Sequence, residues 1–362
     1  MMETHRCWVE INRAALRHNA AAMRERIGSA ELLAVVKANA YGHGMIGVAE
    51  ALRDDVQIFG VANLEEAIAL RAALPHPIMI LGPALPTERS TISKRGFIPS
   101  ISTLEEAQAF NQLGPIEINF KIDTGMGRMG VAESDALSIF KSVAALPNTK
   151  IHSLSTHMPV ANEDPVYTRE QLARFAGIVR QLRSEVPGDY KVHVLQSSGT
   201  LAFNETPYEI VRAGIGLYGI SPLPEFQNLL RPALTWKTCV ALIRDVPKGS
   251  SISYGRSFIT PRAMRVATLS AGYADGYPRH LSNRDAAVLI RGRRCALLGR
   301  VTMDLMVVDV SEIEDVDLGD EAVLMGKQGD EEISCAELAE RANTITWEII
   351  TRIGSRVRRV YV

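Results

Sequence analysis

Basic, hydroxyl and imidazole side chains follow several short apolar runs between residues 31 and 216, and these residue types can bind anions and transfer protons. Lys37 follows the first run, Lys121 to Arg128 close the fifth, and His157 follows the sixth. Two further groups, at 196–200 and 212–216, follow the seventh and eighth runs. Each group alone could be a solvated loop, but five at comparable positions predict a single site.

The apolar runs themselves are short and rich in β-branched residues, and amphipathic stretches with helical spacing, such as 64–70 and 167–182, lie between them. Eight strands alternating with helices over about 200 residues predict a parallel (β/α)8 barrel of the TIM type, within residues 1–232. Active sites of such barrels lie at the carboxyl ends of the strands, where the five groups fall. The runs are 32–36, 58–61, 78–81, 97–98, 116–122, 151–156, 192–195 and 210–211.

The pattern of the sequence changes after residues 222–224. Short alternating runs broken by Gly and Asp, as at 239–244 and 286–291, replace the long helical patterns until Cys335. A mostly-β domain over residues 233–362 fits this pattern. The predicted fold class is therefore α/β, with an N-terminal TIM-type barrel followed by a C-terminal mostly-β domain.

The composition favours a cytoplasmic enzyme that acts on small molecules. With 40 Lys and Arg against 41 Asp and Glu, the formal net charge is -1, which provides no field to attract nucleic acid or an anionic membrane. No apolar run approaches the roughly 18 residues of a membrane-spanning helix, and the N-terminus lacks the apolar core of a signal peptide. The 4 cysteines are far apart and have no histidines at ligand spacing, so neither a disulfide framework nor a metal site is indicated.

The segment after the fifth predicted strand carries two motifs of other protein classes. Residues 125–130 match the GxGxxG fingerprint of dinucleotide-binding proteins, but they follow the fifth strand, and Lys150 stands where a ribose-binding acid is expected. Residues 123–125, Asp-Thr-Gly, match aspartic proteases, which need two such carboxylates, and no second copy occurs. Both interpretations are therefore disfavoured.

Four segments together resemble the alanine racemase family. Residues 34–44, AVVKANAYGHG, are similar to the family signature for attachment of pyridoxal 5′-phosphate (PLP), and residues 121–130 resemble its K-x-D-T-G-M-G-R-x-G segment. Residues 270–276, SAGYADG, and 299–304, GRVTMD, are two further marks of the family. The resemblance runs from about Trp8 to Tyr361 and implies an α/β barrel, a C-terminal β domain, a homodimer with shared active sites, and PLP-dependent racemisation of alanine.

The resemblance assigns roles around the cofactor ring to five of the basic residues. Lys37 would bind PLP covalently as a Schiff base, and Arg128 would face its phenolic oxygen. Arg212 would pair with the pyridine nitrogen and keep it unprotonated, which favours racemisation over transamination. His157 would lie near the ring and hydrogen-bond to Arg212. Lys121 matches a position that is carbamylated in some members, where the new negative charge would orient Arg128.

The phosphate group of the cofactor would be held by a second set of residues. The resemblance assigns this role to Tyr41, Ser197 and the backbone amides of Gly214 and Ile215, with glycine allowing close backbone approach. Many members place a further phosphate-binding tyrosine where this sequence has Ser355, which puts one phosphate contact in doubt.

Inversion at the α-carbon requires a base on each face, because one base cannot readily remove a proton from one side and return it to the other. Lys37 would be one base, and the resemblance makes Tyr254 of the partner subunit the other, with His157 and Arg212 as the implied relay. The substrate pocket would be completed by Arg128 and, from the partner chain, by Met303, Tyr273 and Asp304.

Two alternatives remain beside an alanine racemase supplying D-alanine for peptidoglycan. A broad-specificity amino-acid racemase would use the same two bases, and the sequence hardly discriminates between the two substrate ranges. A non-catalytic PLP-binding barrel protein would need the barrel and Lys37, but not Tyr254, Met303 or Asp304. The loop at 158–164 also departs from the family pattern, without touching either proposed base.

Overall fold

The computed structural model describes residues 5–203 and 208–362. Their packing divides the chain into two compact units. The barrel unit comprises Ala14–Ala40 and Met45–Arg231. The C-terminal unit comprises Pro232–Val362 together with the N-terminal segment through Arg13 and with Tyr41–Gly44. The sequence-based division at residue 232 does not anticipate these two short additions.

Eight parallel strands form the barrel unit, in the order β10-β2-β3-β4-β5-β6-β8-β9, with β7 beside β6. Arg212 N donates to Leu195 O over 3.0 Å, which links β10 to the residues after β9 and nearly closes the ring. The predicted (β/α)8 barrel is confirmed, and each predicted run lies on a strand. The strands are β2 (Glu31–Val35), β3 (Ile58–Val61), β4 (Ile78–Ile80), β5 (Ile98–Ile101), β6 (Ile116–Asp123), β7 (Val131–Ala132), β8 (Thr149–Ser155), β9 (Lys191–His193) and β10 (Ile210–Ala213).

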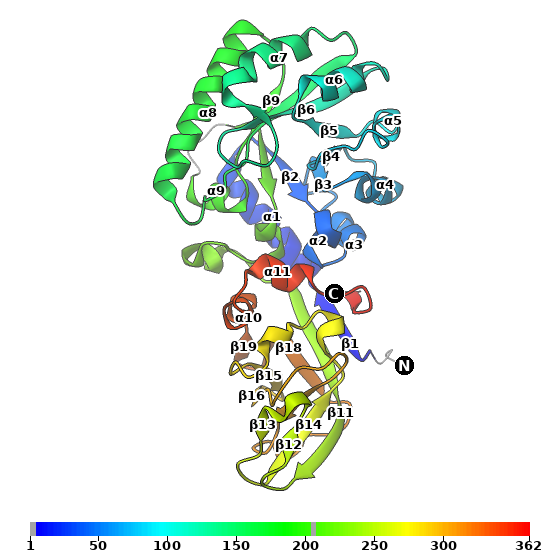
Figure 1. Ribbon diagram of the computed structural model, residues 1–362, viewed down its shortest axis with the longest axis vertical. Helices are drawn as coiled ribbons and strands as arrows, with labels where there is room; N and C mark the ends of the chain where they lie inside the picture. The colour runs from blue at the N-terminus through cyan, green and yellow to red at the C-terminus, as the bar shows by residue number, and fades with distance from the viewer. Residues whose placement is uncertain (1–4, 204–207) are drawn as a thin grey trace. The chain divides into compact units, whose positions relative to one another are not determined.

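Helices cover the outside of these strands (Figure 1). Because parallel strands are buried on both faces, β3, β4 and β5 are buried at every position and lack the alternation of an exposed sheet. The helices are α1 (Arg13–Ile27), α2 (Lys37–Tyr41), α3 (Met45–Ala51), α4 (Leu64–Ala73), α5 (Arg89–Lys94), α6 (Leu104–Asn111), η1 (Glu133–Asp135), α7 (Ala136–Ala144), α8 (Pro165–Glu185), α9 (Ser197–Ala202), η2 (Ile215–Tyr218) and η3 (Pro224–Leu229). In the described part of the chain, no helix combines the length and apolar character needed to cross a membrane.

The α4 and α6 helices begin with the same capping arrangement. Asn63 and Thr103 accept hydrogen bonds from the backbone N–H groups of Glu66 and Glu106, over 3.0 and 3.1 Å. The two glutamate side chains in turn accept from the backbone N–H of Ala62 and Ser102, over 2.8 and 2.7 Å. These bonds satisfy N–H groups that have no partner within the helix, and they tie each helix start to the preceding strand.

The C-terminal unit is the predicted mostly-β domain. Its main sheet has the order β16-β15-β18-β11-β1-β20, and the long strand β11 also pairs with β14, beyond a register shift between Val240 and Leu242. The elements are β1 (Cys7–Ile11), β11 (Leu234–Val246), β12 (Ser251–Ile252), η4 (Tyr254–Arg256), β13 (Phe258–Ile259), β14 (Met264–Leu269), η5 (Tyr273–Asp275), η6 (Arg279–Leu281), β15 (Ala287–Ile290), β16 (Arg293–Ala296), β17 (Met306–Asp309), β18 (Glu321–Gln328), β19 (Glu331–Ile333), α10 (Cys335–Ala342), α11 (Thr346–Thr351) and β20 (Arg358–Tyr361).

The strand β1 explains why the first residues join this unit. Val9 lies opposite Trp236 in the antiparallel pair with β11, and opposite Arg359 in the parallel pair with β20. Val9 and Trp236 are both fully buried. The chain thus passes through the C-terminal sheet at β1 before it enters the barrel.

Candidate active site

The basic residues of the predicted site gather at the carboxyl ends of the barrel strands. Lys37 lies just beyond the end of β2, with Val36 as the one residue between them, as expected. Lys121 and Arg212 were expected at the points where their strands end, but they lie inside β6 and β10, because these strands continue to Asp123 and Ala213. Residues of barrel strands alternate between the interior and the helix layer, and Arg212 is only 6% exposed. The guanidinium therefore belongs to the barrel interior and not to a solvated loop.

Four cationic groups influence one another in this region: Lys37, Lys121, Arg128 and Arg212. Burial and the charge of Arg128 lower the pKa of Lys37, while the carboxylate of Glu66 opposes this change. Burial and the charge of Arg212 lower the pKa of Lys121 to about 7. Both lysines are thus closer to the neutral form, in which an amine is a nucleophile or a base. The excess of positive charge suits an anionic ligand.

Arg212 is held by acceptors on the strands around it. Its Nη1 donates to His193 Nδ1 over 2.6 Å and to His193 O over 3.1 Å. Its Nη2 donates to Thr156 O and Val194 O, each over 2.9 Å, and approaches His157 Nδ1 at 3.3 Å. Burial lowers the pKa of Arg212 to about 10, so the guanidinium stays charged at neutral pH. These contacts occupy both Nη atoms and leave Nε–H as the donor for a bound group.

His193 is a member of the site that the sequence analysis did not identify. It lies at the end of β9 and is fully buried, and burial with the charge of Arg212 holds its pKa well below the ordinary value of 6.5. Since Arg212 can only donate, His193 Nδ1 is the acceptor and its proton sits on Nε2. That proton points to Asn119 Oδ1 at 3.0 Å, and Asn119 Nδ2 donates to Ser100 Oγ over 2.9 Å. In the sequence, the only sign that His193 belongs to the site is a histidine within an apolar predicted strand.

The same reasoning sets the protonation of His157. Arg212 Nη2 already donates to two carbonyl oxygens and approaches His157 Nδ1 at 3.3 Å, and because a guanidinium can only donate, this weaker contact favours the tautomer with the proton on Nε2. Burial and the charge of Arg212 lower the pKa of His157 to about 2. Gln171 on α8 donates to His157 O over 3.0 Å and to Thr124 Oγ1 over 2.7 Å, which holds the start of this loop. His157 is therefore a neutral, fixed imidazole, and not a residue that titrates near neutral pH.

The proposed phosphate-binding residues lie partly in the barrel unit. Ser197 Oγ accepts from Gly214 N over 2.9 Å and from Gly216 N over 3.1 Å, which joins the first turn of α9 to that of η2. A Cβ on Gly216 would lie 2.7 Å from Met23 Cε and 3.3 Å from Ser197 Oγ, so a larger residue here would displace the Met23 side chain and crowd Ser197. Ile215 lies between the two glycines. Tyr41 is packed with the C-terminal unit, and burial raises the pKa of its hydroxyl to about 12.

The backbone after Lys37 adopts an unusual conformation. Ala38, Asn39, Ala40 and Tyr41 have φ values of 52, 54, 53 and 52°, all in the left-handed region, so α2 is a left-handed turn and not an ordinary α-helix. Each such residue costs roughly 1–2 kcal/mol, so the turn carries about 4–8 kcal/mol that other contacts must offset. Strain of this kind is common where a functional side chain has to be aimed. The Asn39 side chain contributes one such contact by accepting from Met45 N over 2.9 Å.

The loop after β6 has a structural role, which argues against both the dinucleotide-binding and the aspartic-protease interpretation of its sequence. Asp123 Oδ1 accepts from Gly125 N over 2.9 Å and from Met126 N over 2.8 Å, so the carboxylate organises its own loop. A Cβ on Gly130 would lie 2.6 Å from Asp123 N, so this position requires glycine for close packing. The short strand β7 follows, and not the helix that a dinucleotide-binding turn would begin. The loop presents Arg128 beside the strand ends.

Tyr254 is presented on a strained turn of the C-terminal unit. Its neighbours Ser253, Gly255 and Arg256 have φ values of 63, 72 and 48°. A Cβ on Gly255 would lie 2.7 Å from the guanidinium carbon of Arg300, so the turn packs tightly against that side chain. The tyrosine itself is 70% exposed. Positive φ at the non-glycine residues Ser253 and Arg256 makes this turn a candidate functional position.

The other predicted substrate residues belong to the same unit. Tyr273 N donates to Thr302 O, and Ala274 N donates to Met303 O, each over 3.0 Å, so Tyr273 and Met303 are neighbours. These two side chains are 41% and 53% exposed. Asp304 pairs with Arg356 over 2.8 Å.

Arg356 was not identified from the sequence, although it organises this part of the unit. It makes a two-point ion pair with the buried Asp275, over 2.7 and 2.9 Å, in addition to its bond to Asp304. Asp275 also accepts from Gly272 N over 2.8 Å. These acceptors raise the pKa of Arg356. Arg356, Asp275 and Asp304 line a cavity of about 620 Å³ within the C-terminal unit. The other lining residues are His5, Arg6, Cys7, Ser270, Leu305 and Arg358.

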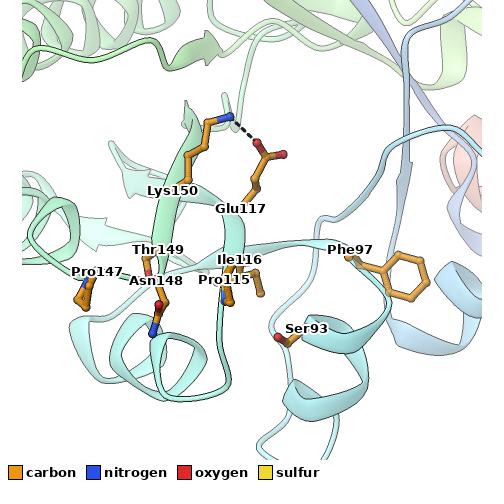
Figure 2. Close-up of a pocket in the computed structure, with 10 residues that line it drawn as sticks. Ser93, Phe97, Pro115, Ile116, Glu117, Pro147, Asn148, Thr149 and Lys150 are labelled. Atoms are coloured by element: carbon orange, nitrogen blue, oxygen red, sulfur yellow. Dashed lines mark hydrogen bonds and ion pairs between the residues drawn. The ribbon is translucent and has the colours of Figure 1, made fainter.

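A second hollow lies at the opposite end of the barrel strands (Figure 2). It has a volume of about 430 Å³ and is lined by residues at the starts of β5, β6 and β8, including Phe97, Ile116 and Asn148. Lys150 on β8 pairs with Glu117 on β6 over 2.7 Å across the two strands. The Lys150 side chain is largely exposed and that of Glu117 is partly exposed, and this end of a barrel usually serves stability. The basic cluster, and not this hollow, is the candidate active site.

Comparison with known proteins gives concordant matches in both units. Residues 11–222 match the family described as alanine racemase, N-terminal domain, and residues 233–361 match alanine racemase, C-terminal domain. An alanine racemase of Halothermothrix orenii is 41% identical over 372 residues, covering 99% of this chain and 97% of that protein. The structure of an alanine racemase from Bacillus anthracis with bound L-Ala-P is 34% identical, with a TM-score of 0.91, covering 99% of this chain and 95% of that one. An alanine racemase from Bartonella henselae with covalently bound pyridoxal phosphate is 28% identical, with a TM-score of 0.91, covering 99% and 100% of the two chains.

Proposed function

The chain belongs to the alanine racemase family through both of its domains, and we propose that it interconverts L-alanine and D-alanine with bound PLP. The family makes it an isomerase. The observation that carries the proposal is Lys37, a lysine with a lowered pKa at the carboxyl end of the first barrel strand, beside two arginines. The match of the second domain through residue 361 argues against a non-catalytic barrel protein.

The basic residues of the barrel fit PLP by charge. A phosphate ester and a phenolate would relieve the repulsion among Lys37, Lys121, Arg128 and Arg212. Lys37 would bind the cofactor covalently, and Arg128 would face its phenolic oxygen. Ser197, the amides of Gly214 and Ile215, and Tyr41 would hold its phosphate. PLP, when bound, supplies the electron sink that makes the α-proton of alanine acidic.

Arg212 would direct the reaction towards racemisation. It keeps its proton at neutral pH, and it offers a donor and no acceptor to the cofactor's ring nitrogen. His193 and the carbonyls of Thr156 and Val194 fix the guanidinium so that it cannot turn away. By offering only a donor at this position, Arg212 would disfavour proton uptake by the ring nitrogen and would thereby disfavour transamination.

Two bases on opposite faces would invert the α-carbon. Lys37, held at the strand end, would handle the proton of D-alanine, and Tyr254 of the partner subunit would handle that of L-alanine. His157 Nδ1 is occupied by Arg212, so its Nε2–H would be the contact between the barrel and that tyrosine. The exposure of Tyr254, Tyr273 and Met303 supports a homodimer, because these side chains would be covered by the partner's barrel.

Substrate binding would use residues from the barrel of one subunit and from the C-terminal unit of its partner. Arg128 would bind the substrate carboxylate from the barrel. From the partner chain, Met303 through its backbone, Tyr273 and Asp304 would complete the pocket. The ion pair of Arg356 with Asp304 supports a fixed position for this carboxylate. Ser355, where a phosphate-binding tyrosine is usual, lies exposed beside Arg356.

Lys121 is a proposed site of carbamylation. Its pKa of about 7 gives a substantial fraction of neutral amine near neutral pH, which is the form that adds to carbon dioxide. The addition forms an N–C bond and releases one proton, leaving a carbamate anion close to the charge of Arg128. Enzyme equilibrated with carbon-13 bicarbonate should give a carbamate resonance that Lys121→Arg abolishes. Identical spectra for the two proteins would contradict the assignment.

The two-base proposal is tested by exchange of the α-proton in deuterium oxide. In Tyr254→Phe, racemisation should fall equally in both directions, because the equilibrium constant between enantiomers is one. Lys37 should still exchange the α-proton of D-alanine, while L-alanine exchanges far more slowly. Tyr273→Phe is the control, because it alters the same surface without removing a base, and should affect both enantiomers alike. Equal exchange of both enantiomers in Tyr254→Phe would refute the assignment of Tyr254.

Substrate range and role need separate measurements. Assay of the purified enzyme against a panel of L-amino acids distinguishes an alanine racemase from a broad-specificity amino-acid racemase. We expect alanine to be the preferred substrate. A role in supplying D-alanine for peptidoglycan predicts that cells lacking the gene require D-alanine for growth, and growth without it would contradict that role.

A further inference from the structure

The carboxylate of Glu66 lies between two neighbouring strand ends of the barrel. Its Oε2 accepts from Ala62 N over 2.8 Å, which is part of the cap of α4. Its Oε1 accepts from Ala38 N over 2.7 Å, and Ala38 is the residue directly after Lys37. One side chain thus holds the chain after β2 and the chain after β3. Hydrogen bonds to an ionised carboxylate are among the stronger ones in proteins.

The contact with Ala38 falls at the first residue of the left-handed turn. None of Ala38, Asn39 and Ala40 is a glycine, the residue that adopts positive φ without strain. The turn therefore needs hydrogen bonds from other residues to stabilise it. Asn39 provides one bond at its far end, through Met45 N, and Ala40 N donates to Val36 O over 2.8 Å. Glu66 provides the bond at the near end. If that bond is lost, the backbone beside Lys37 is the first part that can relax.

We propose that Glu66 is a positioning residue that holds the left-handed turn and thereby aims Lys37. The inference rests on the proposed function in taking Lys37 as the reactive lysine. Glu66 also supplies negative charge close to a lysine that is otherwise surrounded by Arg128 and Arg212. Its role is to fix the lysine and balance the charge around it.

The chain provides a matched control in α6. Glu106 makes the same cap as Glu66, with Thr103 in place of Asn63 and with Ser102 N as its donor. Its hydrogen bond lies at the start of α6, remote from the turn after Lys37 in the sequence. Glu66→Ala and Glu106→Ala therefore remove equivalent helix caps, but only the first releases the turn.

The experiment compares these two variants and Glu66→Gln by hydrogen–deuterium exchange of the peptides that cover residues 37–45, in the enzyme as purified. We expect exchange in this segment to be at least about tenfold faster in Glu66→Ala than in wild type. Glu106→Ala should leave it unchanged, and Glu66→Gln should fall between, because an amide retains one acceptor oxygen. Exchange in Glu66→Ala equal to that in Glu106→Ala would overturn the proposal.

A second readout separates positioning from general loss of stability. Glu66→Ala should lower kcat at least about tenfold with KM for alanine within about twofold, since a small displacement of a reacting group is costly. Glu106→Ala should have kcat within about twofold of wild type. Equal kcat values in the two variants would overturn the inference. If wild type itself does not racemise alanine, the proposed function fails, and hydrogen exchange still decides whether Glu66 holds the turn.

Discussion

The buried His193 should make the barrel sensitive to acid, and replacing it with glutamine should remove the part of that sensitivity that His193 contributes. The folded protein keeps His193 neutral, because its pKa lies well below 6.5, whereas the unfolded chain takes up a proton near 6.5. Below that pH the unfolded state binds more protons than the folded state, so stability falls as the pH falls. His193→Gln retains an acceptor for Arg212 and a donor for Asn119, but it does not titrate.

The size of this loss of stability follows from the pKa values of His193 in the folded and in the unfolded protein. At about pH 5 the unfolded histidine is roughly 1.5 pH units below its pKa, which corresponds to about 2 kcal/mol of lost stability at 1.36 kcal/mol per unit. At about pH 7 the same contribution is only about 0.2 kcal/mol. The glutamine variant should cost about 1 kcal/mol near neutral pH, through less ideal hydrogen bonds. It should then be about 1 kcal/mol more stable than wild type at about pH 5.

The assay is urea unfolding of the PLP-saturated enzyme at a fixed protein concentration. All three tryptophans, Trp8, Trp236 and Trp347, lie in the C-terminal unit, so far-UV circular dichroism is the better probe of the helix-rich barrel. His280→Gln, at an exposed position, serves as the control. Stability curves of wild type and His193→Gln that stay parallel from about pH 7 to about pH 5 would refute the reasoning.

Three further substitutions test other parts of the site. Lys37→Ala should abolish the visible absorption of covalently held PLP, and wild type should lose the same band on borohydride treatment; a wild-type band unaffected by borohydride would contradict covalent attachment. Arg212→Glu should raise the ratio of transamination to racemisation, measured as pyruvate formed per alanine inverted, whereas an unchanged ratio would separate Arg212 from the ring nitrogen. Ala38→Gly should raise the free energy of unfolding by about 0.5–1 kcal/mol, because glycine tolerates positive φ. The exposed helical Ala173→Gly should lower it by a similar amount, and a loss of stability in both would argue against strain at Ala38.

The elements of the barrel could be predicted from the sequence because their signals are local. Each strand is a short β-branched run, and each helix has apolar residues at helical spacing, so adjacent residues carry the information. Lys37 could be placed for the same reason, since it directly follows a run and parallel strands end at one edge of a barrel. The division into a barrel and a mostly-β domain likewise came from a change in local pattern near residue 222.

The remaining features depend on residues that are distant in the sequence. Val9 joins the C-terminal sheet only through Trp236 and Arg359, and no local pattern identifies such partners. His193 resembles any core residue until the closed barrel brings its imidazole within 2.6 Å of Arg212, and Glu66 resembles an ordinary helix cap until Ala38 N meets its second oxygen. Periodicity reveals which face of an element is buried. The polar partners that meet on that face are decided by the packing of strands and helices, because the energy of a buried charge depends on the groups within a few ångströms of it.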